Sequence, residues 1–522
     1  MTGFPSRHGT VEVDEVSISE KLFEGLVGRE DEQVIIDGPT GRALTAGALM
    51  EQIRRLAGGL TERGVLPGGT VAVLAPNMPE YPVVFHGVAL GGGTVTTINP
   101  TYTAPEITHQ LNDSGATLLV TIPMFAELAE TAIAGTGVRD VAVIGAESGL
   151  SLDDLMGRPL EAQAPVDLRE HVVVLPYSSG TTGRPKGVML THRNLVANVQ
   201  QAGAVAGITP DDVAVAFLPF FHIYGMTVMM NLFLERRAKL VTMPRFDLEL
   251  FLGLIARHRA TRLYIVPPVA LALAKHPMVA EHDMSSVREV FSGAAPLGPE
   301  TEIAVGERLG ASSVQGYGMT ELSPISHMTI GGDARHGSSG QAVPSTECRI
   351  VNPETLQDMG PGEEGELWVR GPQVMKGYLN NPQATAECLT PDGWLRTGDL
   401  AVIDGDGFMF IRDRLKELIK FKGFQVAPAE VEAALIAHPG VADAAVTARR
   451  DEEAGELPVA FVVRAQGPSG SEVTEAELRA HCEGCLAHFK HPCEYRFVDS
   501  VPKSASGKIL RRQLRDLMAA EG

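Results

Sequence analysis

Short apolar segments that alternate with helical patterns constrain the fold of this chain more than any other feature. The run TVAVLAPN at 70–77 precedes PEYPVVFHGVALGG, and ATLLVTI at 116–122 precedes MFAELAETAIAG. The same order returns after residue 211, in VAVAFLPF and then in AKLVTMP before DLELFLGLIARH. Because strand–helix units of this kind build mostly parallel sheets, the pattern predicts an α/β body with two such layers.

Two later segments depart from this alternation. Residues 335–412 contain short strands punctuated by glycine and proline, such as CRIVNPE and GELWVRG, which predicts a small β-rich subdomain. From about residue 414, mixed helix and strand patterns predict a compact α+β unit. The predicted class is α/β, with a large N-terminal body of two α/β subdomains plus the β-rich subdomain, followed by a mobile α+β C-terminal domain. We place these domains at 1–413 and 414–522, as expected for a chain of 522 residues.

Composition and charge exclude several classes of protein. Apolar residues make up 44% and charged residues 21%, which is typical of a globular enzyme rather than a disordered or fibrous chain. The net charge of −20 argues against a large surface for nucleic acid or anionic membrane. No run approaches the roughly eighteen apolar residues of a membrane span, and MTGFPSRHGT does not resemble a signal peptide. We therefore predict a cytoplasmic protein that meets anionic substrates with local positive groups.

The five cysteines do not suggest a disulfide framework, because their number is odd and two of them are isolated. The other three lie in HCEGCLAHFKHPC at 481–493, where two cysteines have zinc-like spacing and three histidines are close by. Leu478, Cys482, Cys485 and Phe489 also recur at helical spacing, so the alternative is that the cysteines pack as small hydrophobes. Because no second Cys-x-x-Cys pair exists, we favour packing and predict no metal at this cluster.

A segment rich in glycine and hydroxyl groups, YSSGTTGRPKG at 177–187, follows the apolar run HVVVLP. Glycine lets backbone N–H groups approach oxyanions, hydroxyls add donors and lysine supplies charge, so the loop suits a triphosphate. Its spacing differs from that of the ordinary P-loop, and glycine-rich loops are also common as flexible turns, so both interpretations stay open. The candidate phosphate-binding residues are Ser178, Ser179, Gly180, Thr181, Thr182, Gly183 and Lys186.

The whole string resembles the phosphate-loop signature of the acyl-adenylate-forming superfamily, which includes acyl-CoA synthetases, carrier-protein-linked adenylation domains and firefly-type luciferases. Further segments appear in that family's order, namely LPFFHIYGM at 218–226, SGAAPLG at 292–298, QGYGMTE at 315–321, GWLRTGDL at 393–400, DRLKELIKFKGFQVAPAEVE at 413–432 and PKSASGKILRR at 502–512. The similarity covers nearly the entire chain and is greatest to 4-coumarate:CoA ligases. It implies an AMP-forming acid–thiol ligase that uses ATP and Mg²⁺ to adenylate a carboxylic acid and then transfers the acyl group to a pantetheine thiol.

The resemblance implies a nucleotide site. Asp399 would hold the ribose hydroxyls, because a carboxylate offers only acceptors to a diol, and Arg414 would lie beside the sugar. Glu321 would help to hold Mg²⁺, a hard cation that prefers oxygen ligands. Taken alone, each of these side chains is equally compatible with a surface or packing role. The positions that would flank the adenine or contact phosphate are Gln315, Gly316, Tyr317 and Thr320.

The resemblance implies that the small domain takes two positions, one for each step of the reaction, and assigns a lysine to each role. Lys508, otherwise a solvated tail charge, would stabilise the negative charge that grows on phosphate during adenylation. Lys416 matches the hinge about which the family rotates its small domain for the second step. The residues that would then approach the thiol or the adenylate are Lys420, Lys422, Gly423 and Gln425, although KELIKFKG is equally compatible with a plain basic surface. Arg245 matches a position that is basic in CoA-binding relatives.

The acid would bind in a flat, mostly apolar slot, with His222 near the reacting carboxylate. The matching positions are Ile223, Tyr224, Thr227, Tyr264, Phe291, Gly293, Ala294, Gly316, Gly318, Pro324, Ile325 and Ser326. Phe291 departs from plant 4-coumarate ligases, which commonly carry a polar or lysine side chain there. A phenyl ring shortens the slot and removes a partner for a para-hydroxyl, at a cost of roughly 1–3 kcal/mol.

We therefore expect benzoate or another small unhydroxylated aryl acid as the substrate, and CoA or an acyl carrier protein as the acceptor. The chain resembles, in particular, a benzoate ligase that loads an acyl carrier protein in enterocin-type polyketide biosynthesis. The alternatives are a 4-coumarate or cinnamate:CoA ligase, luciferase-like oxidation of the adenylate, and a non-catalytic nucleotide-binding protein.

Overall fold

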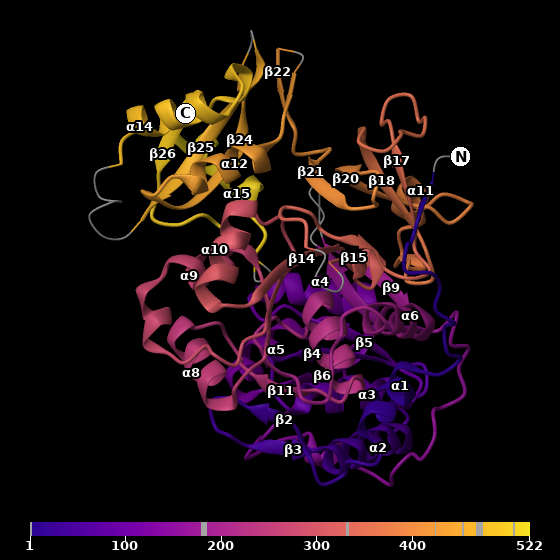
Figure 1. Ribbon diagram of the computed structural model, residues 1–522. Coiled ribbons are helices and arrows are strands. Elements are labelled where there is room, and N and C mark those ends of the chain that lie inside the picture. Colours follow the sequence, from indigo (N-terminus) through magenta and orange to yellow (C-terminus); the bar gives the residue numbers. More distant parts are fainter. Residues whose placement is uncertain are drawn as a thin grey trace.

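A computed structural model gives the fold as a large N-terminal part and a smaller C-terminal part, each with sheets of its own (Figure 1). The predicted α/β class, with a large body and a small second domain, is confirmed by this architecture. The structure describes residues 3–178, 185–329, 334–422, 424–451, 454–465, 473–504 and 507–521.

The first α/β layer is a seven-stranded sheet in the order β19-β9-β8-β5-β4-β6-β7. Alternate residues of β4 enter different clusters: Val71 and Val73 pack with α2 and α3, whereas Ala72 and Leu74 pack with α4 and α5. Helices therefore cover both faces, which is why the strand is apolar throughout. The elements are β4 (Thr70–Leu74), β5 (Thr94–Thr97), β6 (Ala116–Thr121), β7 (Asp140–Val143), β8 (Val172–Ser178), β9 (Lys186–Thr191), β19 (Gly377–Tyr378), α2 (Ala46–Glu62), α3 (Glu80–Leu90), α4 (Ala104–Ser114) and α5 (Ala126–Ala132).

The second α/β layer consists of two adjoining sheets, β10-β11-β2-β3 and β12-β13-β14-β15-β16. They meet where the Thr261 N–H donates to the Val213 carbonyl at 2.9 Å, so the expected second layer is present as a split sheet. Its strands are β2 (Gln33–Asp37), β3 (Ala43–Thr45), β10 (Val213–Ala216), β11 (Lys239–Thr242), β12 (Arg262–Ile265), β13 (Glu289–Ser292), β14 (Ser312–Gly318), β15 (Ile325–Met328) and β16 (Gln341–Ala342). Its helices are α1 (Ile18–Leu26), α6 (His192–Gly203), the π-helix η3 (Tyr224–Leu232), α7 (Phe233–Glu235), α8 (Leu248–His258), α9 (Pro267–Lys275) and α10 (Pro299–Leu309).

The β-rich subdomain predicted from 335–412 is an antiparallel sheet in the order β1-β17-β18-β20-β21. Its outer strand β1 comes from the N-terminus and pairs with β17, where Phe4 lies opposite Cys348, and local sequence patterns do not reveal a pairing of such distant segments. The register of β20 and β21 places Asp399 directly opposite Arg414. The elements are β1 (Phe4–Pro5), β17 (Glu347–Val351), β18 (Glu364–Arg370), β20 (Leu395–Ile403), β21 (Met409–Arg414) and α11 (Pro382–Cys388).

The C-terminal part has its own sheet, β23-β22-β25-β24 with β26 beside β25, and its own hydrophobic core. It follows β21 after a turn that contains the exposed Lys416. The boundary at 413/414 and the hinge at Lys416 remain predictions. The elements are β22 (Ile419–Phe421), β23 (Phe424–Val426), β24 (Val441–Asp451), β25 (Gly455–Arg464), β26 (Glu494–Phe497), α12 (Pro428–Ala437), α14 (Glu475–Cys485) and α15 (Arg511–Glu521).

The cysteine segment packs only in part as predicted. Leu478 and Cys482 of α14 are fully buried in the C-terminal core. Cys485, however, is exposed, because α14 ends there, and Phe489 lies in a separate 3-10 turn where its ring stacks on Phe424 at 4.6 Å. Over the described residues, no three His, Cys, Asp or Glu side chains gather as a metal site would require. None of the described helices has the length and apolarity needed to cross a membrane.

Two helical glycines allow a matched test of the packing. A Cβ on Gly59 of α2 would overlap the Leu155 carbonyl oxygen and the Gly157 nitrogen, whereas a Cβ on Gly253 of α8 meets nothing within 4 Å. Gly59→Ala should therefore cost about 1–3 kcal/mol through overpacking, while Gly253→Ala should be neutral or stabilising by up to about 1 kcal/mol. Thermal unfolding of both variants measures this contrast, and a Gly59→Ala protein that melts at or above wild type would contradict the packing of α2.

Candidate active site

A cavity of about 460 Å³, part of it open to solvent, lies at the carboxyl ends of β13 and β14. Such ends are the usual place for ligand sites in α/β sheets. The start of η3 closes one side, and a loop of the C-terminal part supplies Lys508. The lining residues are His222, Ile223, Tyr224, Phe291, Gly293, Ala294, Gly316, Tyr317, Gly318, Met319, Thr320, Pro324, Ile325, His327 and Lys508. Most positions expected to bind the acid therefore come together.

Phe291 forms part of the wall of this cavity. Its ring stacks on Tyr264 with centroids 5.0 Å apart and planes at 24°, as their paired positions on β12 and β13 allow. A Cβ on Gly316 would overlap the tip of the Phe291 ring, so glycine is what admits the ring there. A Cβ on Gly293 would lie 3.1 Å from the Tyr224 ring, a tight contact that would require the ring to shift slightly. This part of the wall is thus aromatic and closely packed.

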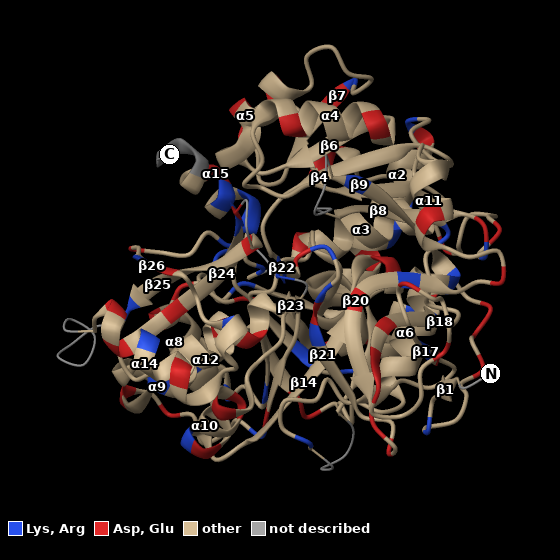
Figure 2. Cartoon of the chain, turned by 90° about the horizontal axis from the view of Figure 1, so that it is seen from above, with Lys and Arg blue, Asp and Glu red and all other residues tan. Residues whose placement is uncertain are grey.

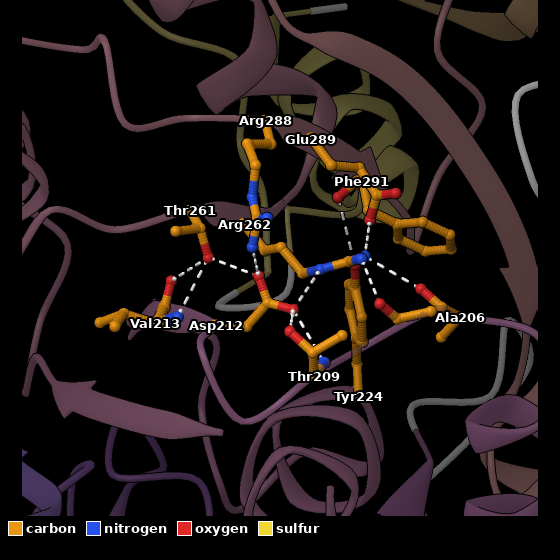
Figure 3. Close-up of polar contacts among 11 residues, drawn as sticks. Ala206, Thr209, Asp212, Val213, Tyr224, Thr261, Arg262, Arg288, Glu289 and Phe291 are labelled. Carbon is orange, nitrogen blue, oxygen red and sulfur yellow. Dashed lines mark hydrogen bonds and ion pairs between the residues drawn. The ribbon is translucent and has the colours of Figure 1, made fainter. Parts of the chain in front are cut away.

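An ion network around Arg262 and Asp212 lies close to Phe291 (Figure 3). The Arg262 guanidinium donates to Glu289 at 2.6 Å and lies 3.1 Å from Asp212. Arg262 and Glu289 precede Tyr264 and Phe291 by two residues on the same paired strands, so they lie on the same face of the sheet. Burial raises the pKa of Glu289, and Arg262 opposes this. The network therefore ties β12 to β13 two residues before the Tyr264–Phe291 stack and connects them to Asp212, which precedes β10.

A second group of residues forms the expected nucleotide side. The Tyr317 hydroxyl donates to Asp399 Oδ2 at 2.6 Å, and Arg414 Nε lies 3.4 Å from Asp399 Oδ1. The antiparallel register of β20 and β21 creates this ion pair. Burial raises the pKa of Asp399, while the Arg414 charge lowers it. A buried carboxylate held in this way has the acceptor chemistry that a ribose diol requires.

Lys508 and His222 face the same cavity. Burial, followed by the nearby Arg414 charge, lowers the pKa of Lys508 to about 8. Burial, followed by the Lys508 charge, lowers the pKa of His222 to about 3. At neutral pH the site therefore combines an ammonium with an uncharged imidazole.

Glu321 has the environment expected of a Mg²⁺ ligand. Its buried carboxylate accepts hydrogen bonds from Ser178 Oγ at 3.2 Å and from the Tyr378 hydroxyl at 2.8 Å. Both bonds end on Oε1, and within the described part of the chain none ends on Oε2. Mg²⁺ is commonly bound by one or two carboxylates together with substrate phosphates, so these residues fit the ion. Bound there, it would neutralise charge on the phosphates of ATP.

The glycine-rich loop is described only at its two ends. Ser178 ends β8 and Lys186 begins β9, while the Lys186 ammonium lies 4.7 Å from the centroid of the Tyr378 ring. The candidates that lie outside the described residues are Ser179, Gly180, Thr181, Thr182, Gly183 and Gly423.

Several predicted residues do not line the cavity. The Gln315 amide bonds to the Leu297 backbone and to Glu302, at 2.6 Å from the carboxylate, so its side chain is turned away. Ser326 lies 2.9 Å from the His327 ring nitrogen. Thr227 and Tyr264 are buried side chains behind the cavity wall. The exposed predicted residues are Arg245, Lys416, Lys420 and Gln425, while Lys422 lies in a turn with its N–H bonded to the Ala454 carbonyl.

Met319, His327 and Tyr378 belong to the site but were not predicted. Met319 lies inside the segment QGYGMTE, so its neighbours were a signal for it. Tyr378 contacts Glu321 although the two residues are 57 positions apart, and no local sequence pattern predicts this contact. Figure 2 also shows that Lys and Arg gather on α15, which begins three residues after Lys508.

Comparison with known proteins agrees with this geometry. The family model of the AMP-binding enzyme matches residues 23–379, and that of the AMP-binding enzyme C-terminal domain matches residues 430–508. The chain is 43% identical to 4-coumarate–CoA ligase 5 of Oryza sativa subsp. japonica over 97% of this chain and 95% of that protein. It is 41% identical to 4-coumarate–CoA ligase 1 of Petroselinum crispum, over 95% and 93%.

Two solved structures are similar over nearly their whole length. The anthranilate CoA ligase AuaEII in complex with anthranoyl-AMP has a TM-score of 0.90 and 28% identity, covering 98% of this chain and 99% of that one. A benzoate CoA ligase from Burkholderia xenovorans LB400 has a TM-score of 0.87 and 26% identity, covering 96% and 99%. With both family models matched and relatives above 40% identity across its length, this chain belongs to the AMP-binding enzyme family and is an AMP-forming acid–thiol ligase of the acyl-CoA synthetase type.

Proposed function

We propose that this chain is an aryl-acid:CoA ligase that first makes an acyl-adenylate and then transfers the acyl group to the thiol of CoA. The observation that carries the proposal is the meeting of Lys508 and His222 at one mostly apolar cavity, with Phe291 in its wall. Asp399, beside Tyr317 of the cavity wall, extends this site towards a nucleotide. A slot for a flat ring and a set of groups for ATP thus lie next to each other.

In the proposed first step, a carboxylate oxygen of the acid bonds to the α-phosphorus of ATP, and pyrophosphate leaves. Negative charge grows on the phosphate oxygens, and the Lys508 ammonium stabilises it in a partly desolvated site. Asp399 would orient the ribose, and Glu321 would hold Mg²⁺ against the phosphates. Thr320 and the loop that ends at Lys186 would supply further phosphate contacts.

In the proposed second step, the thiol sulfur bonds to the acyl carbon, AMP leaves and the thiol proton is released. Lys508 is part of the cavity in this structure, so the thiol needs the C-terminal part to rotate about Lys416. The exposed Lys420 and Gln425 would then approach the adenylate, with Lys422 and Gly423 near the thiol. The uncharged His222 would lie near the acyl carbonyl.

The relatives and the pocket point to different details of the acid. The 4-coumarate–CoA ligases support a cinnamate-type acid with CoA as the acceptor, and they favour this alternative over benzoate and a carrier protein. The Phe291–Tyr264 stack, in contrast, puts a phenyl ring in the wall, and the nearby Tyr224 hydroxyl is already bonded to the Phe291 carbonyl at 3.5 Å. We therefore propose cinnamate, with benzoate as a second candidate, in preference to 4-coumarate.

The acceptor is proposed from two features. CoA is the acceptor named for the relatives, and Arg245 is an exposed guanidinium suited to a CoA phosphate. Loading of an acyl carrier protein, the other expected acceptor, is tested by replacing CoA with a phosphopantetheinylated carrier protein and weighing the products by mass spectrometry.

Lys508→Ala should separate the two half-reactions. Removing the ammonium should lower acid-dependent pyrophosphate release by about 100- to 1,000-fold, whereas transfer from a supplied acyl-adenylate to CoA should persist. Lys503→Ala is the control, because Lys503 lies in the same loop but pairs with Asp443 at 2.6 Å. Equal loss of both half-reactions in Lys508→Ala would contradict the assignment. No acid-dependent exchange in wild type would favour a non-catalytic nucleotide-binding protein.

The same lysine predicts the pH dependence of adenylation. Its pKa of about 8 means that the charged form decreases as the pH rises through 8, so the adenylation rate should fall above that pH. Lys508→Arg should be slower but should lose this decline, because guanidinium stays charged. Pyrophosphate release measured between pH 6 and 10 tests both statements, and an identical alkaline decline in Lys508→Arg would assign it to another group.

Phe291 should set the choice of acid. Since an unpaired buried hydroxyl costs roughly 1–3 kcal/mol, kcat/KM for cinnamate should exceed that for 4-coumarate by about tenfold. Phe291→Ser, which adds space and a hydroxyl, should narrow or reverse this ratio. Pyrophosphate release with benzoate, cinnamate and 4-coumarate measures it. A wild-type preference for 4-coumarate would show that Phe291 does not exclude the para-hydroxyl.

A further inference from the structure

Tyr378 touches two parts of the proposed nucleotide site at once. Its hydroxyl donates to Glu321 Oε1 at 2.8 Å, and the Lys186 ammonium lies over the face of its ring, 4.7 Å from the centroid. The first contact is a hydrogen bond to a carboxylate, and the second is a cation–π contact. Ser178 also donates to Glu321 Oε1, at 3.2 Å, and is paired with Lys186 in the β8–β9 register.

The backbone around Tyr378 ties the same two elements together. The Leu379 N–H donates to the Gly187 carbonyl at 2.8 Å, so strand β19 is paired with β9 directly beside Lys186. The Met375 N–H donates to the Glu321 carbonyl at 2.9 Å. Residues 375–379 therefore bridge the segment of Glu321 and the segment of Lys186, and Tyr378 lies within this bridge.

The strand geometry also limits where the Tyr378 side chain can go. Its own N–H donates to Thr385 Oγ1 at 2.9 Å, which connects β19 to α11. Gly377 has a φ of 148°, and a Cβ there would lie 2.9 Å from the Thr385 methyl group. A glycine before the tyrosine thus lets β19 pack closely on α11, and the phenol is aimed at Glu321.

We propose that Tyr378 is a positioning residue that orients the Glu321 carboxylate for Mg²⁺ and holds the Lys186 ammonium beside it. This inference rests on the proposed function, in which Glu321 binds Mg²⁺ and Lys186 contacts the phosphates of ATP. By occupying Oε1, the phenol fixes the plane of the carboxylate and directs Oε2 to the ion. Through its cation–π contact, the Tyr378 ring holds the Lys186 ammonium close to Glu321 before ATP binds.

The hydroxyl and the ring are tested by different variants. Tyr378→Phe removes the hydrogen bond but keeps the ring, so it should weaken Mn²⁺ binding to the enzyme with a non-hydrolysable ATP analogue by about tenfold. Tyr378→Leu removes both and should in addition weaken binding of the analogue without metal. Mn²⁺ binding is measured by electron paramagnetic resonance, and analogue binding by calorimetry. Tyr81→Phe is the control, because its buried hydroxyl has no hydrogen-bond partner in the described part of the chain.

A double-mutant cycle distinguishes positioning from general support of the fold. If Tyr378 acts through Glu321, Tyr378→Phe should weaken Mn²⁺ binding in the wild type but not further in a Glu321→Gln background. Additive losses, or unchanged Mn²⁺ affinity in Tyr378→Phe, would overturn the role of the hydroxyl. Unchanged analogue affinity in Tyr378→Leu would overturn the role of the ring. All these measurements are made without acid, so failure of the proposed ligase reaction would appear separately, as absent acid-dependent pyrophosphate exchange in wild type.

Discussion

The ion pair between Asp399 and Arg414 is the interaction on which the rest of the site depends. It forms because β20 and β21 pair in a register that places the two residues opposite each other. Arg414 is also the last residue of β21, so the chain enters the C-terminal part directly from this pair. Three residues later, Glu417 accepts a hydrogen bond from Arg511 at 2.5 Å, and Arg511 follows Lys508 by three positions. A short covalent and ionic path therefore connects the proposed ribose carboxylate with the proposed adenylation lysine.

The sequence predicted most of the architecture, because the hydrophobic pattern of each strand and helix is local. Strand β4 and helix α8 lie where their apolar runs indicate. The pairing of β1 with β17 was not predictable, since it joins segments far apart in the chain without a shared pattern. Cys485 shows a different limit. Its helical spacing suggested burial, but α14 ends at that residue, so spacing alone did not determine which side chains meet the core.

The candidate site was predictable where the resemblance supplied positions, and not where side-chain direction decides. Lys508, His222 and Phe291 all face one cavity, as expected from their motifs. Gln315 lies in the expected strand, yet its amide is bonded to Glu302 and the Leu297 backbone. A motif fixes the position of a residue in the chain, whereas its orientation depends on partners from other segments. The same reasoning explains why Tyr378, which contacts Glu321 only through the fold, had no sequence signal.

The proposed acid pocket is constrained by the packing around Phe291. Phe291 cannot be considered alone, because its ring is stacked on Tyr264 and its tip lies over Gly316. Two residues earlier on the same paired strands, the partly buried Arg262 and Glu289 form an ion pair that ties β12 to β13. A substrate that needs more room must therefore move an aromatic stack supported by a paired sheet, rather than one flexible side chain. If the acid binds here as proposed, ring substituents should be discriminated beside this stack more strongly than near Lys508.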